Sequence, residues 1–296
     1  MNIKKEYFIT DDNVELFGLL HTSDKKTDKE VIISTHGMGS NCIKKRDDII
    51  AQKMTENGIS YFTYNNRGYG MINSVNKGKE KILQGTAYED IEDSYYDILG
   101  AINHMINLGY EKIHLKGHSL GSTKTVYTYN KLQKENNMKV LEKIKSIILL
   151  SLVDIPSIMN YFIKQSILDI IKITQEKVAN DELDYIINTK VPFLPLVSVK
   201  TFLKYYKNNE TFDFAKYKKD NFQFEILNNI KVPLYMRWGN VNELIELPAE
   251  ELVKLMNEKI KNDKKDINFI DGATHNYKNK EHILAGEIYA FIKEQY

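Results

Sequence analysis

A serine between two glycines is the side chain of this sequence best placed to act as a nucleophile. It lies in Gly117-His118-Ser119-Leu120-Gly121, after an apolar strand-like run and before a stretch with helical spacing. In that context the pattern G-x-S-x-G predicts a sharp turn that lifts the serine hydroxyl above the edge of a sheet. The glycines let neighbouring backbone pass close by, and N–H groups at the start of the next helix favour a developing negative charge. We therefore predict that Ser119 is a nucleophile.

Two further segments supply the partners that a nucleophilic serine needs. His275, in DGATHNY, follows a predicted strand near the C-terminus and is expected to be the general base. A loop with the sequence HGMG, at 36–39, follows the apolar run VIIST. We expect the backbone N–H groups of Met38 and Leu120 to form an oxyanion hole, where each donor stabilises the transition state by roughly 3 kcal/mol.

Alternating strands and helices are expected to position these residues. Strands are expected at EYFITDD and VELFGLLHT (a hairpin pair), EVIISTHG, ISYFTYNNRG, KIHLKGHS, KSIILLSLVD, VPLYMRWGN and DINFIDGATH. Helices are expected at 44–57, at about 88–108, directly after Ser119, and at PAEELVKLMNEKI and EHILAGEIYAFIKEQ. This alternation predicts an α/β fold in which a mostly parallel sheet is covered by helices on both faces.

Residues 155–230 interrupt that alternation. They are mostly helical by pattern and lie between two late strands, so we predict a helical cap inserted into a core made of 1–154 and 231–296. We expect most aromatic side chains of the cap to form its own small core. These residues are Tyr161, Phe162, Phe193, Phe202, Tyr205, Tyr206, Phe212, Phe214, Tyr217, Phe222 and Phe224.

Taken together, these motifs resemble those of the α/β-hydrolase superfamily, in particular its cap-bearing serine esterases. The match runs from HG at 36–37 through NNRGYG at 65–70 and GHSLG at 117–121 to GATH at 272–275, and covers the chain except the cap. The second motif departs from the common D-x-R-G-x-G-x-S, because Asn65 replaces the aspartate and Ser74 comes late. The resemblance implies acyl-transfer chemistry, with the triad in the chain order serine, acid, histidine.

The triad acid is not where the resemblance places it. In the superfamily it usually follows the strand that we place at VPLYMRW, in a turn of the form G-x-x-D. Here the turn offers Asn240 and Asn242, and an amide in this role costs about 10⁴-fold in turnover in a serine protease. We expect Glu243, one residue later, to act as the acid, with Asp154 at the end of the preceding strand as the alternative. The segment WGNVNELI also resembles the corresponding sequence in a branch of the superfamily that is related to siderophore esterases.

Composition excludes several other classes of protein. The 41 basic and 40 acidic residues leave a net charge of +1, which gives no electrostatic footprint for nucleic acid or an anionic membrane. Cys42 is the only cysteine, so an intramolecular disulfide and a multi-cysteine metal site are excluded. No stretch approaches the roughly 18 apolar residues of a membrane span or resembles a signal peptide, so a cytoplasmic protein is expected. The remaining histidines lack metal-ligand spacing and no phosphate-binding loop is present, so neither a metal nor an organic cofactor is expected.

The sequence therefore predicts a serine hydrolase that works through an acyl-enzyme. The aromatic cap favours a small to medium apolar or aromatic substrate, and the resemblance favours a carboxylic ester over a peptide. Two alternatives stay open. One is a thioesterase or amidase of a biosynthetic pathway, and the other is a non-catalytic ligand-binding homologue without a functional acid, which the asparagines of the acid loop favour. Covalent reactivity of Ser119 distinguishes the non-catalytic alternative from the enzymes.

Overall fold

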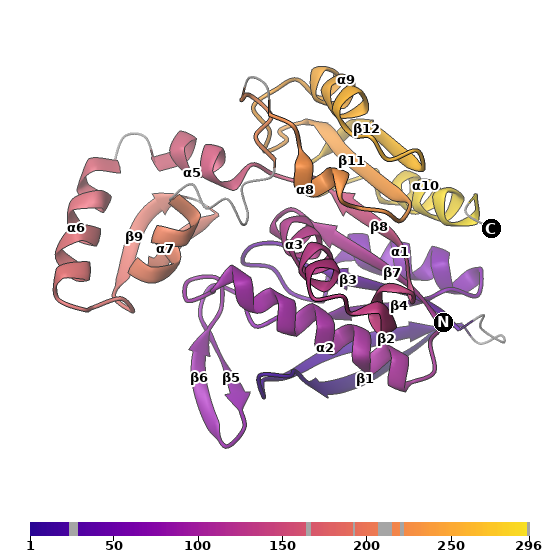
Figure 1. The fold of residues 1–296 in the computed structure, drawn as a ribbon, viewed down its shortest axis with the longest axis horizontal. Coiled ribbons are helices and arrows are strands. Elements are labelled where there is room, and N and C mark those ends of the chain that lie inside the picture. The colour runs from indigo at the N-terminus through magenta and orange to yellow at the C-terminus, as the bar shows by residue number, and fades with distance from the viewer. Residues whose placement is uncertain (24–28, 164–166, 192, 207–214, 220–221, 295–296) are drawn as a thin grey trace.

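A sheet of eight strands forms the centre of the computed structural model, which describes residues 1–23, 29–163, 167–191, 193–206, 215–219 and 222–294 (Figure 1). The strand order is β1-β2-β4-β3-β7-β8-β11-β12. β1 pairs antiparallel with β2, as does β2 with β4, and the other pairs are parallel. The strands are β1 (Asn2–Ile9), β2 (Glu15–Thr22), β3 (Glu30–Thr35), β4 (Ser60–Tyr64), β7 (Lys112–His118), β8 (Ile144–Leu150), β11 (Leu234–Val241) and β12 (Lys265–Thr274).

The parallel strands end together at one edge of the sheet. Thr35 of β3 stands opposite Gly117 of β7, and Leu150 of β8 stands opposite both His118 and Arg237. β3 and β4 are buried along their whole length, as expected for strands with helices on both faces. The loops that follow β3, β7, β8 and β11 therefore leave the sheet side by side, at the edge where open α/β sheets bind ligands.

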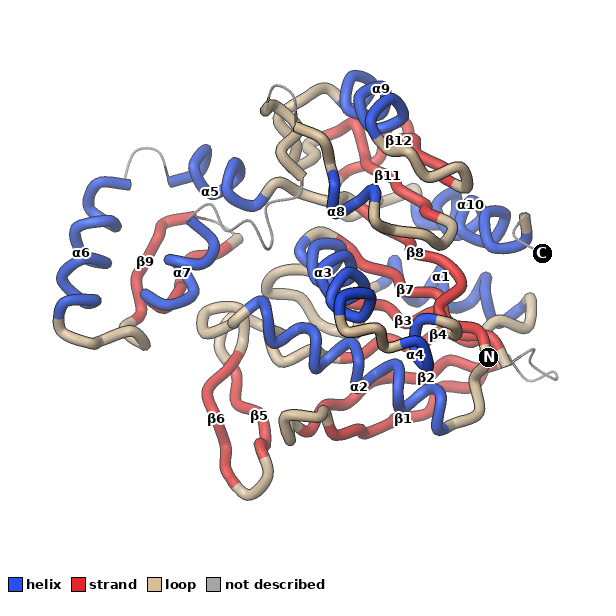
Figure 2. Tube along the Cα trace, viewed as in Figure 1, coloured by secondary structure: helices blue, strands red, loops and turns tan. Residues whose placement is uncertain are grey.

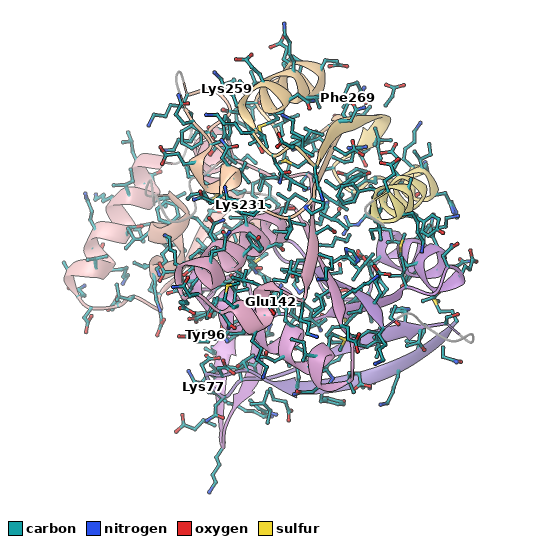
Figure 3. All side chains as sticks on the ribbon, turned by 45° about the vertical axis from the view of Figure 1, so that its right-hand side comes forward. Lys77, Tyr96, Glu142, Lys231, Lys259 and Phe269 are labelled. Carbon is teal, nitrogen blue, oxygen red and sulfur yellow. The ribbon has the colours of Figure 1, made fainter. Side chains whose placement is uncertain are left out.

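Helices cover both faces of the sheet, and each face has its own apolar core. On one face, Ile50 and Met54 of α1 (Lys45–Glu56) share a cluster with Leu284 and Ile288 of α10 (Glu281–Lys293). The other face is covered by α2 (Ser94–Asn107), α3 (Leu120–Lys134), the short α4 (Met138–Leu141) and α9 (Ala249–Lys259). Side chains fill the space between these layers (Figure 3). The predicted mostly parallel, doubly covered sheet is thereby confirmed.

A separate group of elements, which we call the lobe, comprises the described residues of 155–206. Figures 1 and 2 show it set apart from the central sheet, beyond α3. Its elements are α5 (Ile155–Ile163), α6 (Ile167–Ala179), β9 (Ile186–Val191), β10 (Leu194–Ser198) and α7 (Val199–Tyr206). β9 and β10 form a two-stranded antiparallel sheet, where the sequence pattern predicts mostly helix. Apolar side chains of the lobe form a third core that includes Leu120, the residue after the candidate nucleophile.

The aromatic residues of 155–230 divide between two cores. Phe202 and Tyr205 are buried in the core of the lobe, as expected for a cap that packs on itself. Tyr217 and Phe224, which precede α8 (Glu225–Asn228), are buried in the main core instead, where Tyr217 contacts both Phe224 and Trp238. Four of the predicted aromatic side chains lie outside the described part of the chain: Phe162, Tyr206, Phe212 and Phe214.

One hairpin has no counterpart in the sequence-based expectations. β5 (Asn73–Lys77) and β6 (Glu80–Gln84) form an antiparallel ribbon that projects from the core, with Lys77 labelled in Figure 3. Of these ten residues only Val75 is buried, and the rest are partly or fully exposed. Because a ribbon that is solvated on both sides carries no alternating apolar pattern, its sequence does not predict strands.

Candidate active site

Ser119 occupies a strained turn between β7 and α3. Its backbone has φ 55° and ψ −126°, in a region that residues with a side chain rarely adopt. Two hydrogen bonds hold the turn: the Ser119 N–H donates to the Leu150 carbonyl oxygen, and the Ser122 N–H donates to the Ser119 carbonyl oxygen, each at 2.8 Å. This is the sharp strand-to-helix turn that the sequence pattern predicts for an exposed nucleophile.

The two glycines of the motif allow α3 to lie against the sheet. A Cβ atom at Gly117 would lie 2.4 Å from the Gly121 carbonyl oxygen, and one at Gly121 would lie 2.3 Å from the Thr35 carbonyl oxygen. Both separations are well below van der Waals contact, so a side chain at either position would push the helix start away from β3. The position of Ser119 therefore depends on both glycines.

His275 and Glu243 form a hydrogen-bonded pair beyond the end of β12. Nδ1 of His275 donates to Oε1 of Glu243, which fixes the ring tautomer and leaves Nε2 as the nitrogen that can exchange a proton. In the part of the chain that the structure describes, Nε2 has no hydrogen-bond partner. The Glu243 side chain is only 2% exposed, whereas that of His275 is 14% exposed.

Glu243 reaches the histidine because the chain turns sharply after β11. Asn242 has φ 50°, a left-handed conformation that asparagine tolerates better than most residues. Beyond it the Glu243 side chain folds back on its own strand, where Oε2 accepts a hydrogen bond from the Gly239 N–H at 2.9 Å. Asn240 is used elsewhere, since its side-chain oxygen accepts from the Gly272 N–H at 2.8 Å. Neither asparagine of the predicted acid turn takes the place of the acid.

Hydrogen bonds keep the Glu243 carboxyl ionised. Burial alone would raise its pKa, but the hydrogen bond and charge of His275, with further donors, outweigh burial and hold the pKa below its ordinary value. One of these donors is Ser151, whose hydroxyl donates to Oε2 at 2.8 Å. The Tyr277 hydroxyl lies 3.1 Å from Ser151 Oγ and donates to the Arg237 carbonyl oxygen at 2.8 Å. An ionised carboxylate in this position can stabilise an imidazolium.

Asp154, the alternative acid, lies at the start of α5. Its Oδ1 accepts a hydrogen bond from the Ser157 N–H at 3.2 Å, which is the arrangement of a helix N-cap. Among the contacts of His275 with described residues, none is with Asp154. The structure therefore brings Glu243, and not Asp154, to the histidine.

Two neutral histidines support the loops around the site. His118 Nε2–H donates to the His275 carbonyl oxygen at 2.8 Å, and burial holds the pKa of His118 well below its ordinary value. His36 lies within 2.9 Å of the Gly37 carbonyl oxygen through Nδ1, and burial lowers its pKa to about 3. Both contacts are with backbone carbonyl groups of loops at the site.

The candidate oxyanion donors lie on either side of the serine turn. Leu120 is the first residue of α3, so its N–H has no carbonyl partner within the helix. Met38 lies in the loop after β3, which adjoins the turn because Thr35 pairs with Gly117. Met38 and Leu120 line the same cavity as Ser119 and His275, so the structure brings these four predicted residues together.

This cavity has a volume of about 540 Å³, within the roughly 300–1,000 Å³ typical of small-molecule sites. Its lining residues form two groups that differ in chemistry, and we call the parts of the cavity that they line its apolar end and its charged end. One end is lined by apolar side chains from the chain after β8, from the lobe and from the acid loop: Val153, Ile155, Ile158, Met159, Phe193 and Leu244. The other is lined by charged side chains from the start of α1 and from the chain after His275: Lys44, Lys45, Arg46, Lys278 and Glu281.

Sequence reasoning missed the residues that support the acid and those of the charged end. Ser151 contacts Glu243, and Tyr277 contacts Ser151 although the two are 126 positions apart in the sequence. No local motif marks either residue. The run KKR at 44–46 was visible in the sequence. Its position at the start of a predicted helix beside the HGMG loop was the signal that could have placed it at the site.

Two indicators of other kinds of function are absent from the described ranges. No three side chains of His, Cys, Asp or Glu gather there as ligands for a metal ion. No helix in those ranges has the length and apolar character needed to cross a bilayer.

Solved structures similar to this chain share its architecture over nearly its whole length. No protein-family model matches the sequence, and no curated protein matches it either. The α/β hydrolase GrgF from Penicillium sp. sh18 superposes with a TM-score of 0.68 at 17% identity, covering 100% of this chain and 99% of that one. Est1E from Butyrivibrio proteoclasticus gives a TM-score of 0.66 at 15% identity, covering 98% of each chain.

A third similar structure is a soluble variant of monoglyceride lipase from Saccharomyces cerevisiae, in complex with a substrate analogue. Its TM-score is 0.66 at 14% identity, covering 100% of this chain and 96% of that one. Identities this low carry information about the architecture alone. Together with the strand order and the turn at Ser119, these similarities establish that the chain has the α/β-hydrolase fold.

Proposed function

We propose that this protein is a serine hydrolase that cleaves a carboxylic ester, or a related acyl bond, through an acyl-enzyme. The observation that carries the proposal is the pairing of His275 with the buried Glu243 carboxylate, because His275 lines one cavity with a serine in a strained strand-to-helix turn. Pairing of a general base with an orienting carboxylate next to a candidate nucleophile is the arrangement that activates a hydroxyl at neutral pH.

In the first half of the reaction Ser119 Oγ attacks the substrate carbonyl carbon. Nε2 of His275 takes the hydroxyl proton as the new C–O bond forms, and Glu243 stabilises the resulting imidazolium. The tetrahedral intermediate then collapses, the bond to the leaving alcohol breaks, and the imidazolium returns its proton to that alcohol. The products of this half-reaction are the free alcohol and an acyl group on Ser119.

The backbone N–H groups of Met38 and Leu120 bind the oxyanion of the intermediate. Each such donor contributes roughly 3 kcal/mol because the charge it stabilises develops only in the transition state. In the second half-reaction His275 takes a proton from water, the hydroxide attacks the acyl carbon, and Ser119 leaves with that proton. The carboxylic acid is released and the free enzyme returns.

The apolar end of the cavity supports a small to medium substrate with an apolar or aromatic part. Side chains of the lobe line that end, which supports the interpretation of 155–206, within the predicted insertion 155–230, as a cap over the site. The described residues of 215–230 pack in the main core instead, with 1–154 and 231–296. Among the similar structures, one is of ferulic acid bound to Est1E, and another is the lipase complex. Cleavage of an ester is consistent with both. The resemblance of WGNVNELI to the siderophore-esterase branch stays a prediction.

The test is covalent labelling with a fluorophosphonate probe, followed by intact-mass measurement. We expect the unaltered protein to gain the mass of one probe, with loss of fluoride, and Ser119→Ala to gain none. A folded, unaltered protein that does not label, or a Ser119→Ala variant that labels at the same rate, contradicts the proposal. The first of these outcomes would favour a non-catalytic ligand-binding protein.

The same assay identifies the acid. Glu243→Gln removes the charge beside His275 with little change in shape, so we expect labelling to slow by about 100-fold or more. Asp154→Asn is the matched control, because Asp154 caps α5 and does not contact the histidine. Its labelling rate should stay within about threefold of the unaltered rate.

A further inference from the structure

The charged end of the cavity holds more positive than negative charge. Among the described residues that line the cavity, four side chains are cationic and Glu281 is the one carboxylate. Glu281 is near Lys45, with 3.6 Å between the Lys45 Nζ and Glu281 Oε1. Lys44, Arg46 and Lys278 have no carboxylate among the lining residues. The proposed ester hydrolysis makes no use of these charges.

Arg46 is a buried cation with an unfilled hydrogen-bonding position. Only 7% of its surface is exposed, and in the described part of the chain its Nε–H has no acceptor. Its Nη2 donates to Asp47 at 2.9 Å, but Asp47 also accepts from Lys116 at 2.7 Å and from Tyr61 at 2.6 Å. Two cations thus share one buried carboxylate, so positive charge is left over. Arg46 also lines the cavity, so an anion bound beside it would compensate this charge.

The backbone at this end also favours an anion. Lys44 is the N-cap of α1, and Lys45 and Arg46 begin its first turn. The first N–H groups of a helix lack partners, and its N-terminus carries a partial positive charge. The side chains of Lys44 and Lys45 repel that charge, whereas Asp47 and Asp48 in the first turn favour it, and Asp47 pairs with Arg46. The basic residues therefore do not stabilise the helix start, and an anion bound beside them would be favourable.

The reaction itself determines which part of the substrate faces this end. Nε2 of His275 must return its proton to the leaving oxygen, so the leaving group lies on the His275 side of the reacting carbon. Lys278 and Glu281 follow His275 in the chain and line the charged end with the start of α1. The apolar end, near the lobe, is left for the acyl group.

We propose that the leaving group of the substrate carries an anionic group, a carboxylate or a phosphate, which is bound by Arg46 and Lys44 with Lys278 nearby. This inference rests on the proposed function and narrows it to esters with an apolar acyl part and an acidic alcohol part. Arg46 supplies a planar set of donors suited to either anion.

The test compares esters that differ only in charge. The substrates are 3-carboxyphenyl butanoate, its neutral 3-carbamoylphenyl analogue and 3-phosphonooxyphenyl butanoate. We expect kcat/KM for at least one anionic ester to exceed that for the neutral ester by about tenfold or more, since hydrogen bonds to buried charged groups are strong. The anionic ester with the larger kcat/KM relative to the neutral ester shows whether the site prefers a carboxylate or a phosphate. Ratios of one or less for both anionic esters overturn the proposal.

Two variants and a control locate the effect. Arg46→Gln and Lys44→Gln should each lower the anionic-to-neutral ratio by about fivefold or more. Lys44→Gln serves as the second variant because Arg46 also supports Asp47 and its replacement can affect folding. Lys254→Gln, on the exposed face of α9 and away from the cavity, should leave the ratio unchanged. A ratio that neither cavity variant changes overturns the proposal.

Failure of this inference differs from failure of the proposed function. If the neutral ester is hydrolysed and the ratios are near one, only the anion site is wrong. If Ser119 does not react, the hydrolase proposal fails, and the anion site is then tested by titrating the unaltered protein with 3-hydroxybenzoate and 3-hydroxybenzamide under NMR observation. Tighter binding of the benzoate is expected, and equal affinities overturn the site.

Discussion

In the described part of the chain, one group of serine, histidine and glutamate contributes its serine and its histidine to the cavity, and a second such group lies within the sheet. In the second group, Nε2 of His114 lies 2.9 Å from Glu30 Oε1, and Nδ1 lies 2.7 Å from Ser146 Oγ. All three side chains are buried within the sheet, where His114 and Ser146 are direct partners in the β7–β8 register. By hydrogen bonding alone, this group resembles a triad more closely than Ser119, His275 and Glu243 do, because no hydrogen bond joins Ser119 to His275 among the described residues.

The difference between the two groups shows what the three residue types require in order to react. Both ring nitrogens of His114 have hydrogen-bond partners, and Ser146 lies within β8 and is not among the residues that line the cavity of Ser119 and His275. His275 keeps Nε2 for proton exchange, and Ser119 is held in a left-handed turn next to candidate oxyanion donors. We infer that the His114 group stabilises the sheet, and that access and backbone geometry, rather than proximity of the three types, decide which group can be catalytic.

The largest expected effect comes from removing the two serines in turn. Ser119→Ala should lower turnover of a reactive ester by about 10⁴-fold or more, because no other residue in the site replaces the nucleophile. Ser146→Ala should leave turnover within about threefold, yet lower the free energy of unfolding by about 1–3 kcal/mol, since His114 loses a buried partner. Ester kinetics and urea unfolding measure the two effects. A folded Ser146→Ala variant without activity would contradict the inference that the His114 group is structural and the Ser119 group is catalytic.

Replacement of Glu243 should affect activity, and replacement of Glu30 should affect stability. Glu243→Gln should lower kcat by about 10³- to 10⁴-fold, because a neutral amide cannot stabilise the imidazolium of His275. Glu30→Gln should change kcat by less than about threefold and reduce the free energy of unfolding by about 1–3 kcal/mol. Circular dichroism of both variants provides the control for folding. Equal losses of activity in the two variants would mean that the His114 group is coupled to the reaction.

Much of the fold could be predicted from the sequence because its strands are buried on both faces. VIIS and SIILL are continuous apolar runs between glycines and polar turns, and the structure places β3 and β8 there. The 73–84 hairpin could not be predicted, since it has almost no buried residues. The division of the aromatic residues of 155–230 between two cores could not be predicted from the sequence either, because it depends on where the chain returns to the main sheet.

The candidate site was predictable where one motif fixes one backbone shape. GHSLG alone determines the turn at Ser119, so the serine was identified without its neighbours. The acid was ambiguous because the reach of Glu243 depends on the φ angle of Asn242, which the sequence does not specify. The pairing of His114 with Glu30 joins residues 84 positions apart and follows only from the order of the strands.

Glu243 and Glu30 should contribute in the same way to the pH dependence of the unfolding free energy, although only Glu243 is expected to affect activity. Burial would raise the pKa of each, but hydrogen bonding and charge from the paired histidine lower both below the ordinary value. A lowered pKa in the folded state means that the contribution to stability is present above the unfolded pKa of about 4.3 and is lost as pH falls through the folded pKa. We expect each Glu→Gln variant to lose less unfolding free energy than the unaltered protein between about pH 6 and pH 3. Urea unfolding at several pH values checks this, and a variant that loses as much as the unaltered protein contradicts it.

The smallest expected effect concerns the position where the resemblance looks for the acid. Asn242 is exposed, and the carboxylate of Glu243 already contacts His275, so Asn242→Asp should change kcat/KM by less than about threefold. The informative variant is the pair Asn242→Asp with Glu243→Gln. If Glu243 acts because the left-handed turn at Asn242 directs the next residue toward the histidine, an aspartate within the turn cannot replace it, and the double variant should be as slow as Glu243→Gln alone. Recovery of tenfold or more in kcat would show instead that either position can supply the acid, and that the loop adapts to whichever carboxylate is present.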